Sequence, residues 1–230
     1  MSETLSVPGL DGIPVQLRRS ARARRMSLRV GRSDGRVTLT LPQGMSERQA
    51  GAFVRDQAAW VRRAVAAVPA LRVVRVGGSV PLLGRDVPVV AGSGRAARHL
   101  GATIAVADDV QAGRRVQALL LSLARTHLAA SVDRYAEAIG RRPAKLSLRD
   151  TRSRWGSCSS RGALMFSWRL VMAPPEVLDY VAAHEVAHLL HMDHSPRFWT
   201  AVERLVPDYA VHRAWLRTDG AALHAIDFTG

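Results

Sequence analysis

The hydrophobic and polar positions in the first half of the chain alternate over short segments, a pattern typical of β-strands. Leu28–Val30 and Val37–Leu41 alternate on either side of the turn residues Ser33-Asp34-Gly35, which predicts a β-hairpin. Ser46 and Gln49 have the spacing of a capping box and predict the start of one helix. Later apolar segments, separated by Gly and Pro residues, predict a small β-meander: Val73–Val76, Val80–Leu83, Val87–Val90 and Ile104–Val106.

Apolar residues at helical spacing dominate the second half of the chain. A long helix is expected from about Arg114 to Ile139, because Gly140 is a suitable residue to end it. Two strands are expected at Lys145–Arg149 and Ala163–Val171, separated by the polar, turn-rich stretch 155–160. Proline residues and apolar stripes predict three further helices, which begin at Pro174, at Pro196 and at about Tyr209.

The composition restricts the class of protein. With 230 residues, the chain is long enough for one large domain or two small ones, and its hydrophobic fraction of 47% is ordinary for a globular protein. No run of about 18 apolar residues occurs, so we expect no membrane span, and the N-terminal residues lack the pattern of a secretory signal. Cys158 is the only cysteine and cannot form an internal disulfide. Together these features predict a cytoplasmic location.

Much of the net charge of +14 lies in a basic segment near the N-terminus. Between Ile13 and Ser46, Asp34 is the only acidic residue against a set of arginines: Arg18, Arg19, Arg22, Arg24, Arg25, Arg29, Arg32 and Arg36. The segment Arg18–Arg36 could attract the phosphate backbone of nucleic acids without sequence preference. The alternative is a solvated strand face, which we favour because no aromatic residues are interleaved for stacking on bases.

The candidate chemistry lies in His184-Glu185-Val186-Ala187-His188, an H-E-x-x-H motif within a predicted helix. On a helix, His184 and His188 lie one turn apart on the same face and can bind one metal ion, at about 2.0–2.1 Å for zinc. Glu185 then lies beside the metal, where it can accept a proton from water as a general base. The alternative is a group of helix-surface histidines. The clustering of His184, His188, His191 and His194 favours the metal site.

A catalytic zinc site needs a third protein ligand and an open fourth position. On a continuing helix, His191 would lie about 4–5 Å further along the axis, too far to share the ion. His194 is better placed if the helix stops at about residues 192–194, and Ser195 with Pro196 predicts that a new helix starts there. The spacing equals that of the motif H-E-x-x-H-x-x-G-x-x-H, although His191 occupies its glycine position. Glu203 is the competing third ligand.

Four motifs of the C-terminal half occur in a specific order and spacing. They are Arg154-Trp155-Gly156-Ser157-Cys158, Ala173-Pro174, Asp179-Tyr180-Val181 ahead of the H-E-x-x-H residues, and His194-Ser195-x-x-Phe198-Trp199. In these motifs the chain resembles the YgjP-like metallopeptidase family, a relative of the SprT-like and WLM zinc peptidases. The N-terminal half is similar more loosely, through Arg18–Arg25 and Leu82-Leu83-Gly84. Asp193 stands where Asn is expected in many relatives, and either residue can shape the turn.

The resemblance implies an α+β fold, in which a zincin-like metallopeptidase domain over residues 111–230 follows a smaller, basic, β-rich region with one helix over residues 1–110. It also implies a zinc metallopeptidase that hydrolyses peptide bonds in protein or peptide substrates. In this family Zn²⁺ would be held by residues matching His184, His188 and His194. Glu185 would match the catalytic acid and base.

Several alternatives stay open at this stage. The candidates for a second stabiliser of the oxyanion are Tyr180, Tyr209, His212 and Arg154. The segment Trp155–Cys158 is either a loop at the rim of the active site or a packed structural turn, and we favour the turn; Cys158 as an inhibitory zinc ligand is a lesser alternative. One alternative function is a nucleic-acid-associated protein whose basic N-terminal region could recruit the protease to DNA-bound proteins. Another is a pseudo-enzyme with a structural zinc ion.

Overall fold

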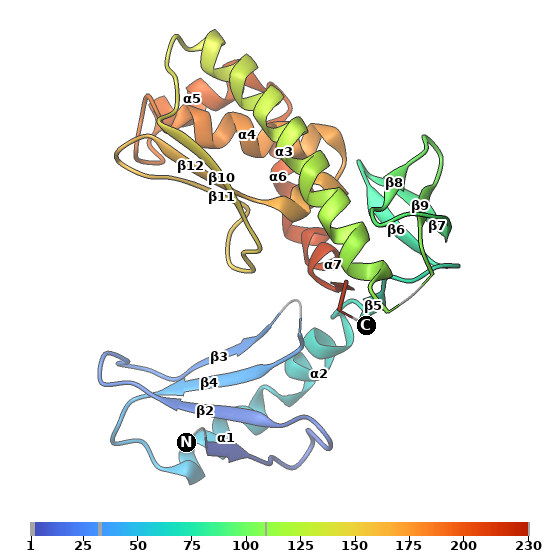
Figure 1. Ribbon diagram of the computed structural model, residues 1–230. Coiled ribbons are helices and arrows are strands. Elements are labelled where there is room, and N and C mark those ends of the chain that lie inside the picture. Colours follow the sequence, from blue (N-terminus) through green and yellow to red (C-terminus); the bar gives the residue numbers. More distant parts are fainter. Residues whose placement is uncertain (1–2, 32–33, 109, 230) are drawn as a thin grey trace. The chain divides into compact units, whose positions relative to one another are not determined.

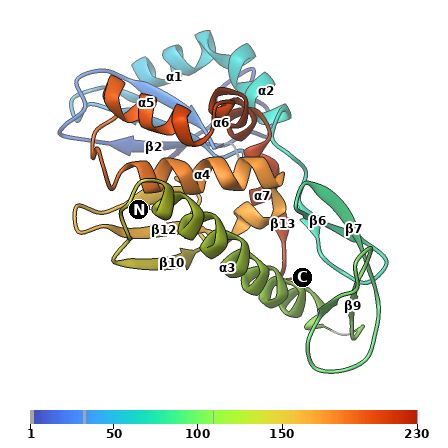
Figure 2. The ribbon, with the colours of Figure 1, turned by 90° about the horizontal axis from the view of Figure 1, so that it is seen from above.

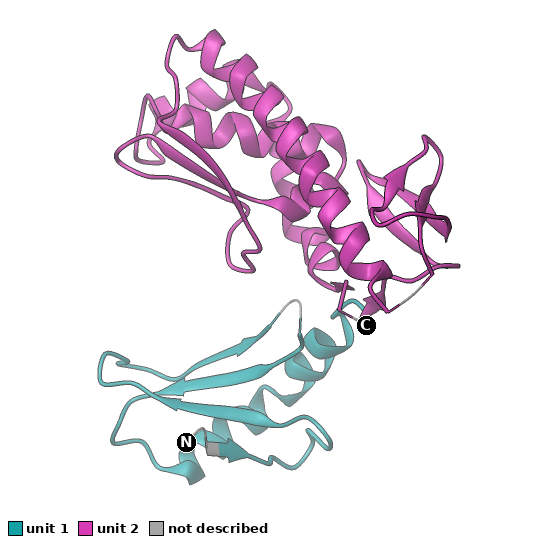
Figure 3. Ribbon diagram, viewed as in Figure 1, with its two compact units in different colours: residues 1–70 teal, residues 71–230 magenta. Residues whose placement is uncertain are grey.

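The structure is a computed structural model of the chain that describes residues 3–31, 34–108 and 110–229 (Figure 1). The chain divides into two compact units, residues 1–70 and residues 71–230 (Figure 3). Each unit combines helices and strands. The division lies at residue 70 and not at residue 110, where the boundary was expected, because buried residues between Val74 and Val106 belong to the core of the second unit.

The first unit is a four-stranded sheet, in the order β1-β2-β4-β3, with two helices (Figure 3). Its elements are β1 (Glu3–Leu5), β2 (Val15–Arg19), β3 (Ser27–Val30), β4 (Val37–Leu41), α1 (Glu47–Asp56) and α2 (Ala58–Ala66). β2 and β4 are parallel, and the other neighbours are antiparallel. The alternate residues of β2 and β4 are buried with Val54 and Val61 of the helices, so one sheet face forms the core of this unit.

The local predictions for the first unit are largely confirmed. β3 pairs with β4 as the expected hairpin, although Arg32 and Ser33 lie outside the described residues. Ser46 Oγ accepts from the N–H of Gln49 at 3.3 Å, and Gln49 Oε1 accepts from the N–H of Ser46 at 3.1 Å, which completes the capping box. The single helix predicted after Ser46 is wrong, because the chain ends α1 and starts α2 at Gln57.

The second unit begins with a small sheet in the order β6-β7-β9-β8. Its strands are β6 (Ser79–Leu82), β7 (Arg85–Ala91), β8 (Arg98–His99) and β9 (Ile104–Val106). The predicted meander is wrong, because β7 pairs with β9 in parallel and β5 (Arg72–Val73) pairs instead with β13 (Ile226–Asp227). Val80, Val89 and Ile104 are buried in the same core as the long helix, which explains why this sheet belongs to the second unit.

The turn between β6 and β7 packs against the start of the motif helix. Leu83 and Gly84 have φ angles of 48° and 75°, as in a type I′ hairpin turn. The N–H of Leu83 donates to the carbonyl oxygen of Val171 at 2.7 Å. A Cβ atom on Gly84 would lie 2.9 Å from Cα of Pro174, so this close approach requires glycine.

The larger part of the second unit packs a three-stranded sheet and helices around the motif helix, α4 (Pro175–Ala187). The long helix α3 (Ala112–Ala138) runs alongside α4 (Figures 1 and 2). The remaining elements are β10 (Lys145–Arg149), β11 (Gly156–Cys158), β12 (Ala163–Ser167), the 3₁₀ helix η1 (Trp168–Met172), α5 (Pro196–Leu205), α6 (Tyr209–Thr218) and α7 (Gly220–His224). The predicted end of α3 is confirmed, since Gly140 follows it with a φ angle of 64°.

The three-stranded sheet differs from the sequence-based prediction at two places. The strand expected at Ala163–Val171 stops at Ser167, and the chain continues as η1. Residues 156–158 were expected in a turn but form β11, an edge strand antiparallel to β12. β11 also contacts α4, so the edge of this sheet lies beside the motif helix. Across the described ranges, no helix has the length and apolar character that crossing a membrane requires.

Candidate metal centre

The motif helix α4 presents two histidines at its C-terminal end. Pro175 occupies its first turn, and the helix buries an apolar surface that includes Val177, Val181 and Val186. His184 lies in the last turn, and His188 is the residue that caps the helix. The helix therefore ends one turn earlier than the stop predicted at residues 192–194. A turn over residues 188–190 follows, in which the N–H of His191 donates to the carbonyl oxygen of Ala187 at 3.1 Å.

The turn after α4 brings a third histidine back to the first two. His194 Nε2 lies 3.3 Å from His184 Nε2, and one ring nitrogen from each of His184, His188 and His194 lies within 4.8 Å of the others. Three ligand atoms at this separation could surround a single ion. The ring of His191 does not belong to this group, and Glu203 is exposed on α5 and also lies outside it.

Hydrogen bonding and ring packing orient the three imidazoles. Nδ1 of His188 lies 3.0 Å from the carbonyl oxygen of His191. Because a carbonyl oxygen only accepts, Nδ1 carries the proton and Nε2 keeps a free lone pair for a metal. Phe198 stacks on His188 at 4.4 Å between ring centroids, and Trp199 lies 5.8 Å from the ring of His194. The sequence-based analysis missed this role of His191, since it depends on a backbone carbonyl.

The environment of the histidines favours their neutral, metal-binding form. Burial lowers the pKa of His184 to about 3, and the neighbouring His188, His194 and Arg213 contribute further. Burial also lowers the pKa of His188, partly opposed by its hydrogen bond to the backbone of His191. Both rings are therefore unprotonated at neutral pH, as ligation requires.

Glu185 follows His184 in α4, and its side chain contacts the edge strand β11. Its side chain is buried, and burial raises its pKa to about 8, while the positive charge of Arg154 acts in the opposite direction. A Cβ atom on Gly156 would lie 2.6 Å from both Cγ and Oε1 of Glu185, so the β11 backbone contacts the glutamate directly. A carboxyl group in such a pocket can hold a proton or release it near neutral pH. A divalent cation beside it would favour the ionised form.

The four candidates for a second oxyanion stabiliser occupy different places. Tyr180 is buried on α4, and its ring centroid lies 5.9 Å from that of His184. The ring centroids of Tyr209 and His212, both on α6, lie 6.4 Å and 6.5 Å from that of Tyr180. Burial raises the pKa of Tyr180 to about 12, so its hydroxyl remains a hydrogen-bond donor. Arg154 is exposed and acts on Glu185 from the loop before β11. The structure thus groups Tyr180 with Tyr209 and His212, whereas Arg154 comes from the loop before β11.

The segment Trp155–Cys158 has features of both interpretations that the sequence left open, a packed structural segment and a segment at the rim of the active site. Trp155 packs on His224 with ring centroids 4.7 Å apart, which is a structural role, whereas Gly156 contacts Glu185. Cys158 is half-buried, burial raises the pKa of its thiol, and it does not belong to the histidine group. The spacing of the motifs in the sequence did not predict the contact between Gly156 and Glu185.

Three histidine nitrogens lie close enough together to hold a metal ion, and a buried glutamate follows the first of these histidines, a pattern typical of metal-dependent hydrolases of the H-E-x-x-H type. A family model described as YgjP-like, metallopeptidase domain matches residues 24–219, and the chain belongs to the YgjP-like metallopeptidase family. The resemblance predicted from the sequence is thereby confirmed, and with it the assignment to the metallopeptidases.

The crystal structure of the metallopeptidase zymogen of Pyrococcus abyssi abylysin is similar at 19% sequence identity and a TM-score of 0.36, over 39% of this chain and 93% of that chain. No curated protein matches the sequence.

Proposed function

We propose that this protein is a zinc-dependent peptidase in which His184, His188 and His194 hold the metal and Glu185 is the general base. The observation that carries the proposal is the convergence of three histidine nitrogens within 4.8 Å beside a buried glutamate. Zinc suits this donor set, because imidazole nitrogen is a preferred zinc ligand and three protein ligands leave a position open for catalysis. The packing of α3 and α4 with the β10-β12-β11 sheet supports the zincin-like domain expected over residues 111–230.

Bound zinc would supply a Lewis acid that lowers the pKa of water and polarises the scissile carbonyl group. The residues of the chain then have distinct roles. Glu185 accepts the proton of the attacking water and returns it to the leaving amine, which its pKa near neutrality permits. We assign the second stabiliser of the oxyanion to the group of Tyr180, Tyr209 and His212, because the ring of Tyr180 lies beside that of His184, the other two rings lie beside Tyr180, and all three side chains can donate hydrogen bonds.

Metal removal and replacement test this proposal. We expect the purified protein to contain about one zinc ion per chain, measured by elemental analysis, and to cleave an unfolded protein substrate. Chelation should abolish cleavage, and zinc should restore it. Zinc bound at full occupancy without cleavage of any of a broad set of peptides would instead favour the pseudo-enzyme with a structural metal.

The first unit supports a second candidate function, binding of nucleic acid through the segment Arg18–Arg36. The sheet face opposite its helices carries Arg18 and Arg29, which line a shallow cavity with Thr38 and Thr40. Both arginines are exposed, and in the described part of the chain neither is paired with a carboxylate. Asp34 also lines this cavity, but it pairs with Arg36. Two unpaired arginines beside hydroxyl groups fit a phosphate backbone. No aromatic residue lies among the residues that line the cavity, so we infer contact with the backbone rather than with bases.

If this face binds duplex DNA, replacing Arg18 and Arg29 by Gln should weaken binding and flatten its salt dependence. The slope of log K against log salt should fall by about two, because each phosphate contact contributes about 0.9 to the slope for B-DNA. Gel shifts or fluorescence anisotropy across salt concentrations would measure this change. Arg48 and Arg55 on α1 provide a control pair with the same change in charge. If both double variants lose the same DNA affinity, or if the parent protein does not bind DNA at low salt, the solvated-face interpretation is correct.

A further inference from the structure

The backbone of β11 forms one wall of the pocket around Glu185. A Cβ atom on Gly156 would lie 2.6 Å from Cγ and Oε1 of Glu185, a distance at which one of the two residues must move. Just before it in the chain, Arg154 provides the positive charge that favours the ionised form of this carboxyl group. The position of the glutamate therefore depends on where the chain places residues 154–156.

Several contacts hold residues 154–156 in place. Thr151 Oγ1 donates to the carbonyl oxygen of Arg154 at 2.8 Å. The N–H of Ser167 donates to the carbonyl oxygen of Trp155, also at 2.8 Å. The ring of Trp155 stacks on His224 with an interplanar angle of 21°. A Cβ atom on Gly220 would lie 3.0 Å from Cζ2 of Trp155, so the backbone of α7 packs closely against the indole. The C-terminal segment thus supports the approach to β11.

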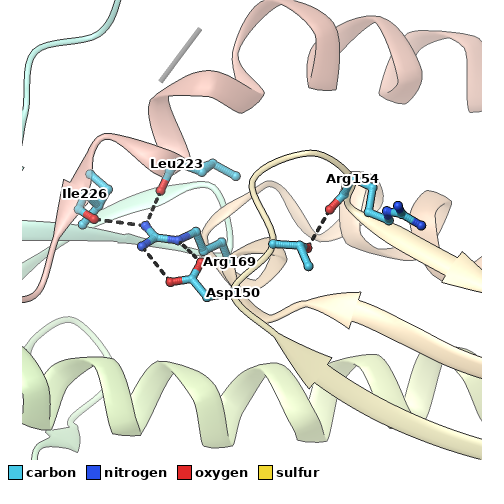
Figure 4. A network of polar contacts seen from close by, with 6 residues as sticks. Asp150, Arg154, Arg169, Leu223 and Ile226 are labelled. Atoms are coloured by element: carbon cyan, nitrogen blue, oxygen red, sulfur yellow. Dashed lines mark hydrogen bonds and ion pairs between the residues drawn. The ribbon is translucent and has the colours of Figure 1, made fainter. Parts of the chain in front are cut away.

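A buried arginine joins this loop to the C-terminal segment (Figure 4). Arg169 of η1 binds Asp150 with two hydrogen bonds, Nε to Oδ1 at 2.7 Å and Nη2 to Oδ2 at 3.1 Å. Its Nη1 donates to the carbonyl oxygens of Leu223 at 2.8 Å and Ile226 at 3.0 Å. Its guanidinium carbon also lies 4.9 Å from the centroid of Trp168. We call this group of Asp150, Arg169 and the two carbonyl groups the Arg169 clasp.

The clasp connects three parts of the chain that are far apart in sequence. Asp150 precedes the loop that carries Arg154, Arg169 follows β12, and the two carbonyl groups belong to the C-terminal segment. Leu223 and Ile226 lie beyond residues 24–219, the range matched by the family model. The side chain of Arg169 is only 8% exposed, and a buried guanidinium group costs much free energy unless its N–H donors are hydrogen-bonded. Breaking one of these contacts is therefore expected to weaken the others.

We propose that the Arg169 clasp holds β11 against Glu185, which makes Asp150 and Arg169 positioning residues for the reaction. This inference rests on the proposed role of Glu185 as general base. If the hydrogen bonds of the clasp are broken, the loop after Asp150 becomes more mobile and Arg154 and Gly156 change position. Glu185 is then no longer held in the position that catalysis requires. The three histidines are held by α4 and the turn after it, so the metal ligands stay in place.

The test uses the full zinc-loaded chain with Asp150→Asn, which disrupts the bidentate pair, and Thr151→Val, which removes a hydrogen bond and leaves the buried arginine paired. We expect kcat to fall by about tenfold to a hundredfold for Asp150→Asn, the usual cost of a misplaced catalytic group, and less for Thr151→Val. KM and the zinc content should stay close to those of the parent protein. Asp86→Asn, which breaks the ion pair with Arg72, and Thr126→Val on α3 are the matched controls.

Cys158 provides a readout that does not depend on catalysis. It is the only cysteine of the chain, it ends β11, and it is half-buried. A thiol reagent should therefore label it severalfold faster in Asp150→Asn and Thr151→Val than in the two controls, at a temperature where all variants remain folded. Unchanged labelling, or faster labelling with an unchanged kcat, would overturn the positioning role.

The two readouts separate this inference from the proposed function. If the parent protein cleaves no peptide, the peptidase proposal fails, and the labelling of Cys158 alone decides whether the clasp holds β11. Gly156→Ala is a further check, because its added methyl group displaces Glu185 while the clasp stays intact. We expect it to lower kcat by about a hundredfold without a change in zinc content. A fully active Gly156→Ala would show that the contact with β11 does not position the glutamate.

Discussion

Replacing Glu185 by Gln should lower peptide cleavage by about two to four orders of magnitude, the usual contribution of a positioned general base. The amide keeps the size and shape of the side chain, so it still fits the pocket beside Gly156. It cannot accept a proton from water. Zinc content should stay near that of the parent protein, because the three histidines are unchanged. Steady-state kinetics on a peptide that the parent protein cuts, together with elemental analysis, would measure both quantities.

The two quantities must be compared in the same preparation. Full activity of Glu185→Gln would rule out the proposed mechanism. Loss of zinc together with activity would mean that the buried glutamate supports the metal site structurally, and another residue would have to act as the base. Glu203→Gln is a suitable control, since it makes the same chemical change at an exposed position on α5.

Replacing His194 by Ala should weaken zinc binding by more than about a hundredfold. Loss of a group that only orients a ligand costs about ten- to a hundredfold, and His194 is proposed to be a ligand itself. Its Nε2 lies 3.3 Å from that of His184, and His194 itself is exposed on the turn after α4. Chelation followed by zinc titration with a competing chromophoric chelator would give the affinity.

Glu203→Ala separates the two candidate third ligands. It should bind zinc like the parent protein, because Glu203 is exposed and lies outside the histidine group. The opposite pattern, in which Glu203→Ala loses zinc and His194→Ala keeps it, would contradict the proposed ligand set. His191→Ala should also keep the three ring ligands, since the contact from His191 to His188 uses a backbone carbonyl oxygen.

Local signals in the sequence were sufficient for several elements of the structure. The capping box at Ser46, the hairpin of β3 and β4, and the end of α3 before Gly140 all occur where they were predicted. Each depends on residues close together in the chain, whose conformational preferences act whatever the rest of the fold does. The H-E-x-x-H spacing likewise places His184 and His188 on one face of a helix, because the helical repeat alone determines it.

Long-range pairing decided what those signals could not. β5 pairs with β13, and β7 pairs with β9 in parallel. The sequence did not predict these pairings, because β5, β13 and β9 have only two or three residues each and so show little periodicity. The stretch at Gly156 was polar enough to predict a turn. Pairing with β12 made it an edge strand instead, because hydrogen bonds to a neighbouring strand outweigh weak local preferences.

Sequence alone was enough to indicate the family, the three candidate histidine ligands and Glu185 next to the first of them, since these follow from motif order, helix geometry and the helix start predicted at Ser195-Pro196. The end of the helix at His188, the distance of His194 from the other two rings, and the contact of β11 with Glu185 became visible in the folded structure alone. Arg169 gave no sign of its role in the sequence. Its partners lie 19, 54 and 57 residues away, and a buried guanidinium group finds its hydrogen-bond acceptors only when distant segments fold together.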